Sequence, residues 1–300
     1  MKKKTYLFAL MAMALTLGSC SDNENGIGGE TSKYITVSTS IGNMTRVATD
    51  EKGGQTFEEG DEISVYAWTG DATVAPETRE RVVNNAINKL TNGSWVSTPQ
   101  MLWKNNRDKH YFIGVYPTAA ISDLTVGEYT FDVNKQTESD LLVAVNKDGL
   151  SYNVDEQQPV PLTFTHVMAK LVVNLTYKNQ WGGIPTVEKV VVGNAAKEAT
   201  INYLTKVVTP STTAKEDFSL PEITENTKYV SVIIPQEDVK QLTIVIGGKN
   251  FVYDNGTPFK LESGKITTVN LEVGRDEIKL GDVKITDWEN GSTFSGEALN

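Results

Sequence analysis

The sequence contains little of the chemistry on which enzymes and disulfide-stabilised proteins depend. Its 300 residues include one cysteine, Cys20, and two histidines, His110 and His166. A single cysteine excludes an intramolecular disulfide, so the fold must be held by its own core. Neither histidine has a cysteine or a second histidine at metal-ligand spacing, so we expect both to be structural. Gly-x-Ser-x-Gly, His-Glu-x-x-His and phosphate-loop motifs are also absent, and we predict no cofactor, no metal and no catalytic residue.

The apolar run at the start of the chain is too short to be a membrane anchor. It covers residues 6–17 after three lysines, and about a dozen residues cannot cross a hydrocarbon layer of about 30 Å as a helix. The run ends in Leu-Gly-Ser-Cys at Cys20, which resembles a bacterial lipobox. We therefore predict a lipoprotein signal peptide over 1–19 and lipid on Cys20. An ordinary buried cysteine is the alternative that this context disfavours.

Basic residues are too few for a polyanion-binding protein. The chain has 28 basic and 38 acidic residues, and loss of the three lysines with the signal peptide changes the net charge from −10 to −13. Without a basic cluster to offset this charge, nucleic acid is excluded as a partner. Residues 20–33 are polar and Gly-containing and are predicted to be a flexible tether.

The rest of the chain has the composition of a β protein. Glycine (24 residues) far exceeds methionine (6), and 39% of the residues are hydrophobic. Short alternating segments recur about every ten residues with turn residues between them, which is typical of β-sandwiches. Because roughly 280 mature residues exceed one usual domain, we predict two, at 34–178 and 179–300. A polar, Gly-containing stretch at 178–183 marks the boundary.

The expected strands are read from period-two alternation or short apolar runs. In the first of them, Ile35, Val37, Thr39 and Ile41 would share one face. Only residues 77–90 are read as helical. The predicted strands are 34–41, 63–67, 111–117, 141–145, 160–164, 167–177, 187–192, 229–234, 242–246, 251–253, 259–261 and 267–273.

Six segments carry a resemblance to a known family by their order and spacing. They are MTRV (44–47), FEEGDEISVYA (57–67), YFIGVYP (111–117), DLLVA (140–144), LTFTHVMAKL (162–171) and ITDW (285–288). Together they resemble the fimbrillin-like proteins of Bacteroidales, which are related to the major and minor subunits of type V pili. The resemblance extends from the lipobox to the C-terminus.

The resemblance implies a fold, a route and an assembly step. The fold would be two tandem transthyretin-like β-sandwiches. The protein would travel as a lipoprotein to the cell outer membrane and be exposed at the surface, and Asp22 and Glu24 resemble an export signal for that route. In polymerising members an arginine-specific protease cuts after the first strand, and a strand from another subunit replaces the one lost. The matching arginine here is Arg46, and Val47 would become the new N-terminus.

A donor strand would have to come from the C-terminal end of the chain. Ile278 and Leu280 share one phase there, Val283 and Ile285 share the other, and Gly281 with Asp282 would form a bend or bulge between them. Only twelve residues follow Trp288, with few apolar side chains. Stalk, anchor and tip positions therefore stay open.

The sequence thus predicts a structural or accessory pilus subunit that acts in cell adhesion. Its partners would be other pilus subunits, the outer membrane through lipid, and a surface ligand. One alternative is a non-polymerising surface lipoprotein that binds glycan through aromatic residues. A more distant one is a glycosidase that uses the carboxylate pairs at 58–59 and 61–62, which we expect instead to be a solvated loop. The aromatic residues considered for glycan binding are Trp68, Trp95, Trp103 and Trp181.

Overall fold

A computed structural model describes residues 33–42, 56–153, 158–254 and 256–288. The lipidation residue Cys20, the predicted tether up to residue 32, and the processing residues Arg46 and Val47 lie outside this part of the chain. Within it the protein is almost entirely β, which confirms the predicted class. The short helices described are η1 (Thr78–Glu80), α1 (Gln136–Ser139) and η2 (Asn179–Trp181). None of the described helices is long and apolar enough to span a membrane.

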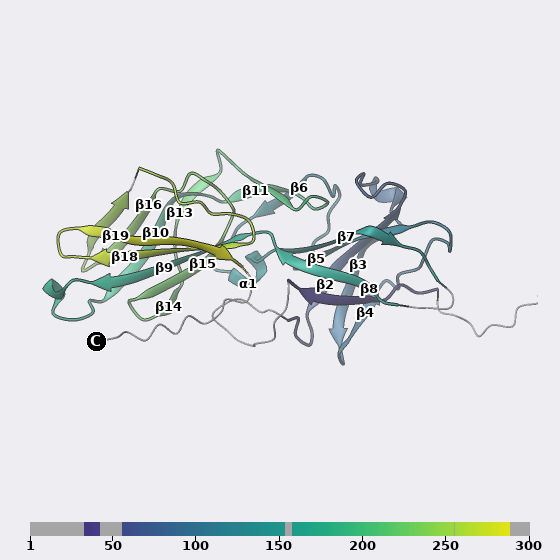
Figure 1. Ribbon diagram of the computed structural model, residues 1–300, viewed down its shortest axis with the longest axis horizontal. Helices are drawn as coiled ribbons and strands as arrows, with labels where there is room; N and C mark the ends of the chain where they lie inside the picture. Colours follow the sequence, from purple (N-terminus) through teal and green to yellow (C-terminus); the bar gives the residue numbers. More distant parts are fainter. Residues whose placement is uncertain (1–32, 43–55, 154–157, 255, 289–300) are drawn as a thin grey trace, which may run out of the picture. The chain divides into compact units, whose positions relative to one another are not determined.

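One seven-stranded sheet is built from the first part of the chain (Figure 1). Its spatial order is β1-β8-β7-β5-β2-β3-β4, so that the first strand lies at one edge and β4 at the other. All pairs are antiparallel except β1 with β8, which is parallel. The strands are β1 (Val37–Ile41), β2 (Glu62–Thr69), β3 (Val83–Thr91), β4 (Ser94–Thr98), β5 (His110–Tyr116), β7 (Leu142–Leu150) and β8 (Val160–His166).

The later part of the chain contributes most of three further sheets. A five-stranded sheet contains β14 (Glu222–Thr224), β15 (Lys228–Ile233), β9 (Ala169–Tyr177), β18 (Lys265–Val273) and β19 (Ile278–Asp287), in that order. A four-stranded sheet contains β13 (Lys215–Ser219), β10 (Val187–Ala196), β16 (Gln241–Ile246) and β17 (Lys249–Asp254). The three-stranded sheet contains β12 (Val207–Pro210), β11 (Glu198–Asn202) and β6 (Gly127–Thr130).

Sheet membership changes earlier than the predicted domain boundary at residue 178. Strand β9 lies before that boundary, yet it pairs with β15 and β18 of the five-stranded sheet. The change therefore falls between the end of β8 at His166 and the start of β9 at Ala169. Hydrophobic alternation identifies β9 as a strand but carries no information about its partners, because every strand alternates in the same way. The prediction that the chain folds as two separate domains stays a prediction.

The predicted helix at 77–90 is wrong. Residues 83–91 form strand β3, and only 78–80 are helical, as one 3-10 turn. Asn85 has φ = 56°, and the pairing with β2 shifts register between Val65 and Ala67. This bulge inserts one residue into the strand, so that Val83 and Ala86 are both buried although they are three positions apart. A spacing of three is a helical spacing, which explains the error.

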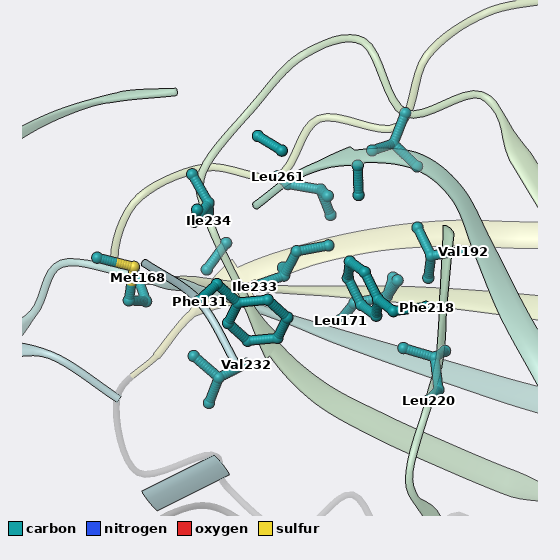
Figure 2. Close-up of a cluster of buried hydrophobic side chains, with 14 of the residues drawn as sticks. Phe131, Met168, Leu171, Val192, Phe218, Leu220, Val232, Ile233, Ile234 and Leu261 are labelled. Carbon is teal, nitrogen blue, oxygen red and sulfur yellow. The ribbon is translucent and has the colours of Figure 1, made fainter. Parts of the chain in front are cut away.

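Two hydrophobic clusters make up the core. The smaller cluster lies on one face of the seven-stranded sheet and includes Ile63, Val65 and Ala67 of β2. Tyr66 and Trp68 of the same strand belong to the larger cluster, which continues into the C-terminal sheets. Strand β2 is therefore buried on both faces, which is why its six central residues are all inaccessible to solvent. Figure 2 shows the C-terminal part of the larger cluster, where Phe131 lies among side chains such as Leu171, Phe218 and Ile233.

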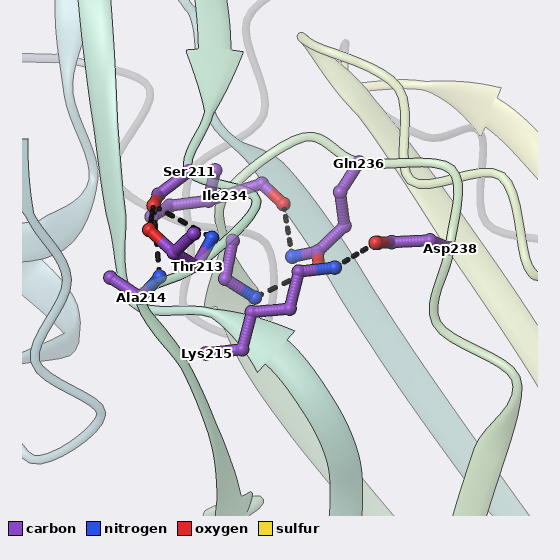
Figure 3. A network of polar contacts seen from close by, with 8 residues as sticks. Ser211, Thr213, Ala214, Lys215, Ile234, Gln236 and Asp238 are labelled. Atoms are coloured by element: carbon purple, nitrogen blue, oxygen red, sulfur yellow. Dashed lines mark hydrogen bonds and ion pairs between the residues drawn. The ribbon is translucent and has the colours of Figure 1, made fainter.

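Polar side chains hold the segment between β15 and β16. Gln236 is 4% exposed, and its side-chain oxygen accepts the Ala196 N–H at 2.9 Å while its amide donates to the Ile234 carbonyl at 2.9 Å. Lys215 pairs with Asp238 close by (Figure 3). The Gln236 contacts satisfy a backbone N–H of Ala196 and a backbone carbonyl of Ile234, and Gln236 itself forms an isolated β-bridge with Leu261.

Candidate functional site

The edge strand β1 is, with β19, one of two described strands that the sequence analysis connected with assembly. It runs parallel to β8, with Val37 opposite Val160 and Ile41 opposite Phe164. The Thr36 carbonyl accepts the Val160 N–H at 2.8 Å. Thr36 and every second residue after it therefore direct their backbone groups toward β8. The N–H and C=O groups of Val37, Thr39 and Ile41 face the opposite side, where the sheet ends.

The side chains of this segment that face inward form part of the smaller core cluster. Ile35, Val37 and Ile41 are 1%, 6% and 8% exposed, which confirms the predicted face. They pack in the same cluster as Leu162 and Phe164 of β8. Loss of this segment would leave an apolar slot beside a strand edge with unpaired backbone groups.

A short bracket holds the start of the segment. The Ile35 N–H donates to the Met101 carbonyl at 2.9 Å, and the Trp103 N–H donates to the Lys33 carbonyl at 3.1 Å. Met101 is itself buried in the same cluster. Beyond this bracket, β1 is paired in the described structure only with β8.

A groove of about 600 Å³ lies along the outer edge of β1. Its far side includes Ser94 and Trp95 of strand β4. The Trp95 indole N–H donates to the Thr39 hydroxyl at 3.0 Å, and the Phe57 ring meets the Trp95 ring edge-on with centroids 5.3 Å apart. The two edges of the seven-stranded sheet thus approach each other through side chains without hydrogen-bonding their backbones.

Phe57 joins the groove to a second hollow at the end of β1. This hollow has a volume of about 270 Å³ and is also lined by Ile41, Tyr116, Asp61 and Asp140. The Tyr116 hydroxyl donates to Asp61 at 3.4 Å. Burial, with the negative charge of Asp61 adding to it, raises the pKa of Tyr116 to about 12. Tyr116 is therefore a neutral donor at physiological pH, not a base.

The carboxylate pairs around residue 60 have partners that hold the turn. Asp61 accepts the Glu58 N–H at 2.7 Å, Glu59 accepts the Asn92 N–H at 2.7 Å, and Glu62 pairs with Lys89 at 2.9 Å. These contacts bind the loop between residue 56 and β2 to the β3–β4 turn. The carboxylates of Glu59, Asp61 and Glu62 are thus occupied as structural acceptors.

The two histidines contact different sets of residues. His110 is buried, and its Nε2 accepts the Lys104 N–H at 3.1 Å. Burial lowers the pKa of His110. His166 places Nδ1 2.8 Å from Asp140 and stacks on Trp288. In the part of the chain that is described, no group of three His, Cys, Asp or Glu side chains could hold a metal ion.

The four tryptophans considered for glycan binding are each held by different neighbours. Trp68 is 1% exposed and donates to the Asp71 carbonyl at 2.9 Å. Trp103 packs edge-on against His110, and Trp181 donates to Val273 at 3.0 Å. Of the four tryptophans, Trp95 lines the groove beside β1.

At the other end of the chain, β19 is an edge strand beside β18. The register shifts opposite Gly281, between the pairs Asn270–Asp282 and Leu271–Leu280, which confirms the predicted bulge. Before the bulge, Ile278 and Leu280 pack against the larger cluster. After it, every residue up to Asp287 is exposed, including Val283 at 40% and Ile285 at 39%.

Sequence reasoning missed two parts of this arrangement. One is Phe57, whose ring also meets Tyr116 and Phe164 edge-on at centroid distances of 5.4 and 5.1 Å. The other is the stack of His166 on Trp288. An isolated aromatic residue between acidic and glycine-rich stretches was the available signal for Phe57. No local signal links His166 to Trp288, because they are far apart in the chain.

A family model described as fimbrillin-like matches residues 45–288. The chain belongs to the fimbrillin-like family. A curated relative from Bacteroides uniformis, Fim1C, named as a proposed fimbrium subunit, is 25% identical over 324 residues, covering 99% of this chain and all of the relative.

Three solved structures of similar fold come from Bacteroides species. A proposed cell adhesion protein from Bacteroides ovatus aligns with a TM-score of 0.63 at 18% identity, over 87% of this chain and 99% of that one. Another from Bacteroides uniformis has a TM-score of 0.61 at 18% identity, over 86% and 100%. A fimbrial protein from Bacteroides vulgatus has a TM-score of 0.54 at 12% identity, over 85% and 99%. At these identities the likeness establishes the fold of this fimbrillin-like chain.

Proposed function

We propose that this fimbrillin-like protein is a subunit of a surface pilus, assembled by exchange of its first strand. It travels to the outer membrane as a lipoprotein attached through Cys20. Proteolysis after Arg46 then releases the lipid, the tether and β1 together, and the chain begins at Val47. The role is structural and serves adhesion. The observation that carries the proposal is the position of β1 at a sheet edge with its apolar side chains in the core.

The slot left by β1 has the properties of an acceptor site. Burial of three aliphatic side chains contributes about 1.5–3 kcal/mol each, or roughly 5–9 kcal/mol together. Loss of Ile35, Val37 and Ile41 would expose a matching area of apolar surface. The edge of β8 would at the same time present unpaired N–H and C=O groups. One incoming strand with alternating apolar side chains would cover the exposed apolar surface and pair with the backbone groups of β8.

Strand β19 supports the donor role. Val283 and Ile285 alternate with polar residues, and both side chains are about 40% exposed where they now lie. Their burial in the slot of another subunit would therefore gain apolar burial that the present fold does not supply. The β18 ladder, the hydrogen bond from Asn270 to Asp282, the ion pair of Lys265 with Asp287 and the contacts of Trp288 hold this stretch in place. Val283 and Ile285 are not members of the core cluster, so detachment gives up core packing mainly at Trp288.

Arginine-specific proteolysis of the mature protein tests this proposal. We expect cleavage after Arg46 and detergent-resistant oligomers with the N-terminal sequence starting at Val47. The variant Arg46→Lys keeps the charge but not the protease specificity, so it should stay monomeric. Oligomers that form equally well from Arg46→Lys, or a cleaved protein that stays monomeric at high concentration, would contradict the proposal.

Glycan binding by a non-polymerising lipoprotein is the second candidate, and the groove beside β1 is the feature that favours it. The groove is lined by hydroxyl side chains and by the half-buried ring of Trp95, and no charged residue lines it. Binding on a glycan array that is lost in Trp95→Ala but kept in Trp181→Ala would support this candidate. Absence of binding in both the intact protein and the controls would remove it.

A further inference from the structure

Residues 117–140, between β5 and β7, form an arm that is anchored in both parts of the molecule. At its root, the Ile121 N–H donates to the Tyr66 hydroxyl at 2.9 Å, and that hydroxyl donates in turn to the Ala119 carbonyl. The Arg81 guanidinium donates to the carbonyls of Ile121 at 2.7 Å and Ser122 at 2.6 Å. Tyr66 and Arg81 belong to the N-terminal part of the chain, so the root is clamped there.

The middle of the arm belongs to a sheet of the C-terminal part. Its strand β6 pairs with β11, from Gly127 opposite Ile201 to Thr130 opposite Glu198 (Figure 1). The Phe131 N–H continues this pairing by donating to the Lys197 carbonyl at 2.8 Å. A Cβ on Gly127 would lie 2.4 Å from the Tyr203 ring, so the two segments are in close contact.

The far end of the arm hydrogen-bonds to strand β15. The Gln136 side-chain oxygen accepts the Val232 N–H at 2.6 Å, and its amide donates to the Ser231 hydroxyl at 3.0 Å. Ser231 is fully buried. One side chain of the arm therefore contacts two polar groups of the five-stranded sheet. Its removal would leave the Val232 N–H without this acceptor, and the Ser231 hydroxyl would keep its bond to the Val232 carbonyl.

The apolar side chains of the arm join the two parts into one core cluster. Ile121, Leu124 and Phe131 are buried in the cluster that contains Tyr66 and Trp68 on one side and Phe218 and Ile233 on the other. The Phe131 and Phe218 rings lie 5.1 Å apart, and both are seen within the packed group in Figure 2.

The two ends of the arm lead into central strands. It follows β5 and precedes β7, which are neighbours in the interior of the seven-stranded sheet. The direct chain connection between the parts, by contrast, is the short stretch from His166 to Ala169. A force applied between the two ends of the molecule can therefore pass through the arm into two interior strands.

We propose that the arm makes the two parts of the protein one cooperative unit, so that heat or tension opens them together rather than as independent domains. The coupling is a property of the single chain. Only its use under tension in an assembled fibre rests on the proposed function.

Calorimetry combined with hydrogen exchange tests the coupling. The intact protein should show one transition, and amides of β2 and of β10 should exchange with the same protection factor. The double variant Phe131→Ala/Gln136→Ala should show two transitions, with β10 losing protection at least 100-fold relative to β2. The control Val126→Ala changes a residue of the arm that is 57% exposed and should keep one transition.

Two separate transitions in the intact protein, or a single transition that persists in the double variant, would overturn the proposal. Pulling single intact molecules by their ends gives a second measurement that needs no variant. One rupture should release both parts at about 3.5 Å per residue. Two ruptures of about half that length would refute the coupling. Neither measurement requires a protease or a second subunit, so the strand-exchange proposal stands or falls separately.

Discussion

The imidazole of His166 stacks face to face on the indole of Trp288, with ring centroids 4.0 Å apart and planes inclined by 5°. A carboxylate oxygen of Asp140 lies 2.8 Å from Nδ1 of the same histidine. The backbone N–H of Trp288 donates to the Gly264 carbonyl at 2.8 Å. The stack therefore fastens the end of β19 to the point where the chain crosses from one sheet to another.

Trp288→Ala should weaken this fastening. Replacement of a packed tryptophan by alanine typically costs about 3–5 kcal/mol, and we expect about 3 kcal/mol here because the neighbouring part of β19 is exposed. Denaturant unfolding measures the change. Trp288→Phe keeps an aromatic ring and should cost less than half as much. A loss below 0.5 kcal/mol, on the order of surface substitutions, would show that the stack does not hold the strand.

Burial of His110 should make stability depend on pH. Because the pKa of His110 is lowered in the folded protein, the unfolded chain binds more protons below its own pKa of about 6.5. The contribution is therefore fully present above that pH and is lost as the pH falls toward the folded pKa. The slope is at most about 1.4 kcal/mol per pH unit. In His110→Gln this part of the slope should disappear from unfolding curves between pH 7 and 5. An unchanged slope would contradict the assignment.

Ile35→Ala should loosen the first strand. The side chain is 1% exposed, and truncation of a buried isoleucine typically costs about 2–5 kcal/mol. Protection of β1 and β8 amides from hydrogen exchange should fall accordingly. Thr36→Ala, at the neighbouring exposed position, is the matched control and should change stability by less than about 0.5 kcal/mol. Equal effects of the two substitutions would mean that β1 is not held by its buried face.

Val283→Asp and Ile285→Asp should separate stability from assembly. Both side chains are exposed in the monomer, so each change should alter the free energy of unfolding by less than about 1 kcal/mol. In a buried slot the same carboxylate would be desolvated without a partner, which is strongly unfavourable. Oligomers after proteolysis should therefore be lost. Thr286→Asp, in the opposite phase, should still assemble. Full assembly of both aspartate variants would exclude β19 as the donor.

The first strand and the bulge at Gly281 could be predicted because their signals are local. Alternation over 34–41 depends only on neighbouring residues, and a glycine between two runs of opposite phase already implies an extra residue. Strand β3 could not be predicted in the same way. The bulge at Asn85 changes the spacing of buried residues from two to three, and a single sequence does not distinguish this from a helical turn.

The sequence by itself determined the class of the protein and many of the segments that become strands, because these follow from composition and side-chain periodicity. The processing residues to be tested, Arg46 and Val47, came from the resemblance to a family. Tertiary structure decided which strands share a sheet, that β9 pairs with the later strands, and that the arm at 117–140 is bound in both parts. The stack of His166 on Trp288 was decided there too. Each of these depends on contacts between residues far apart in the chain, and pairing energies of that kind leave no local pattern.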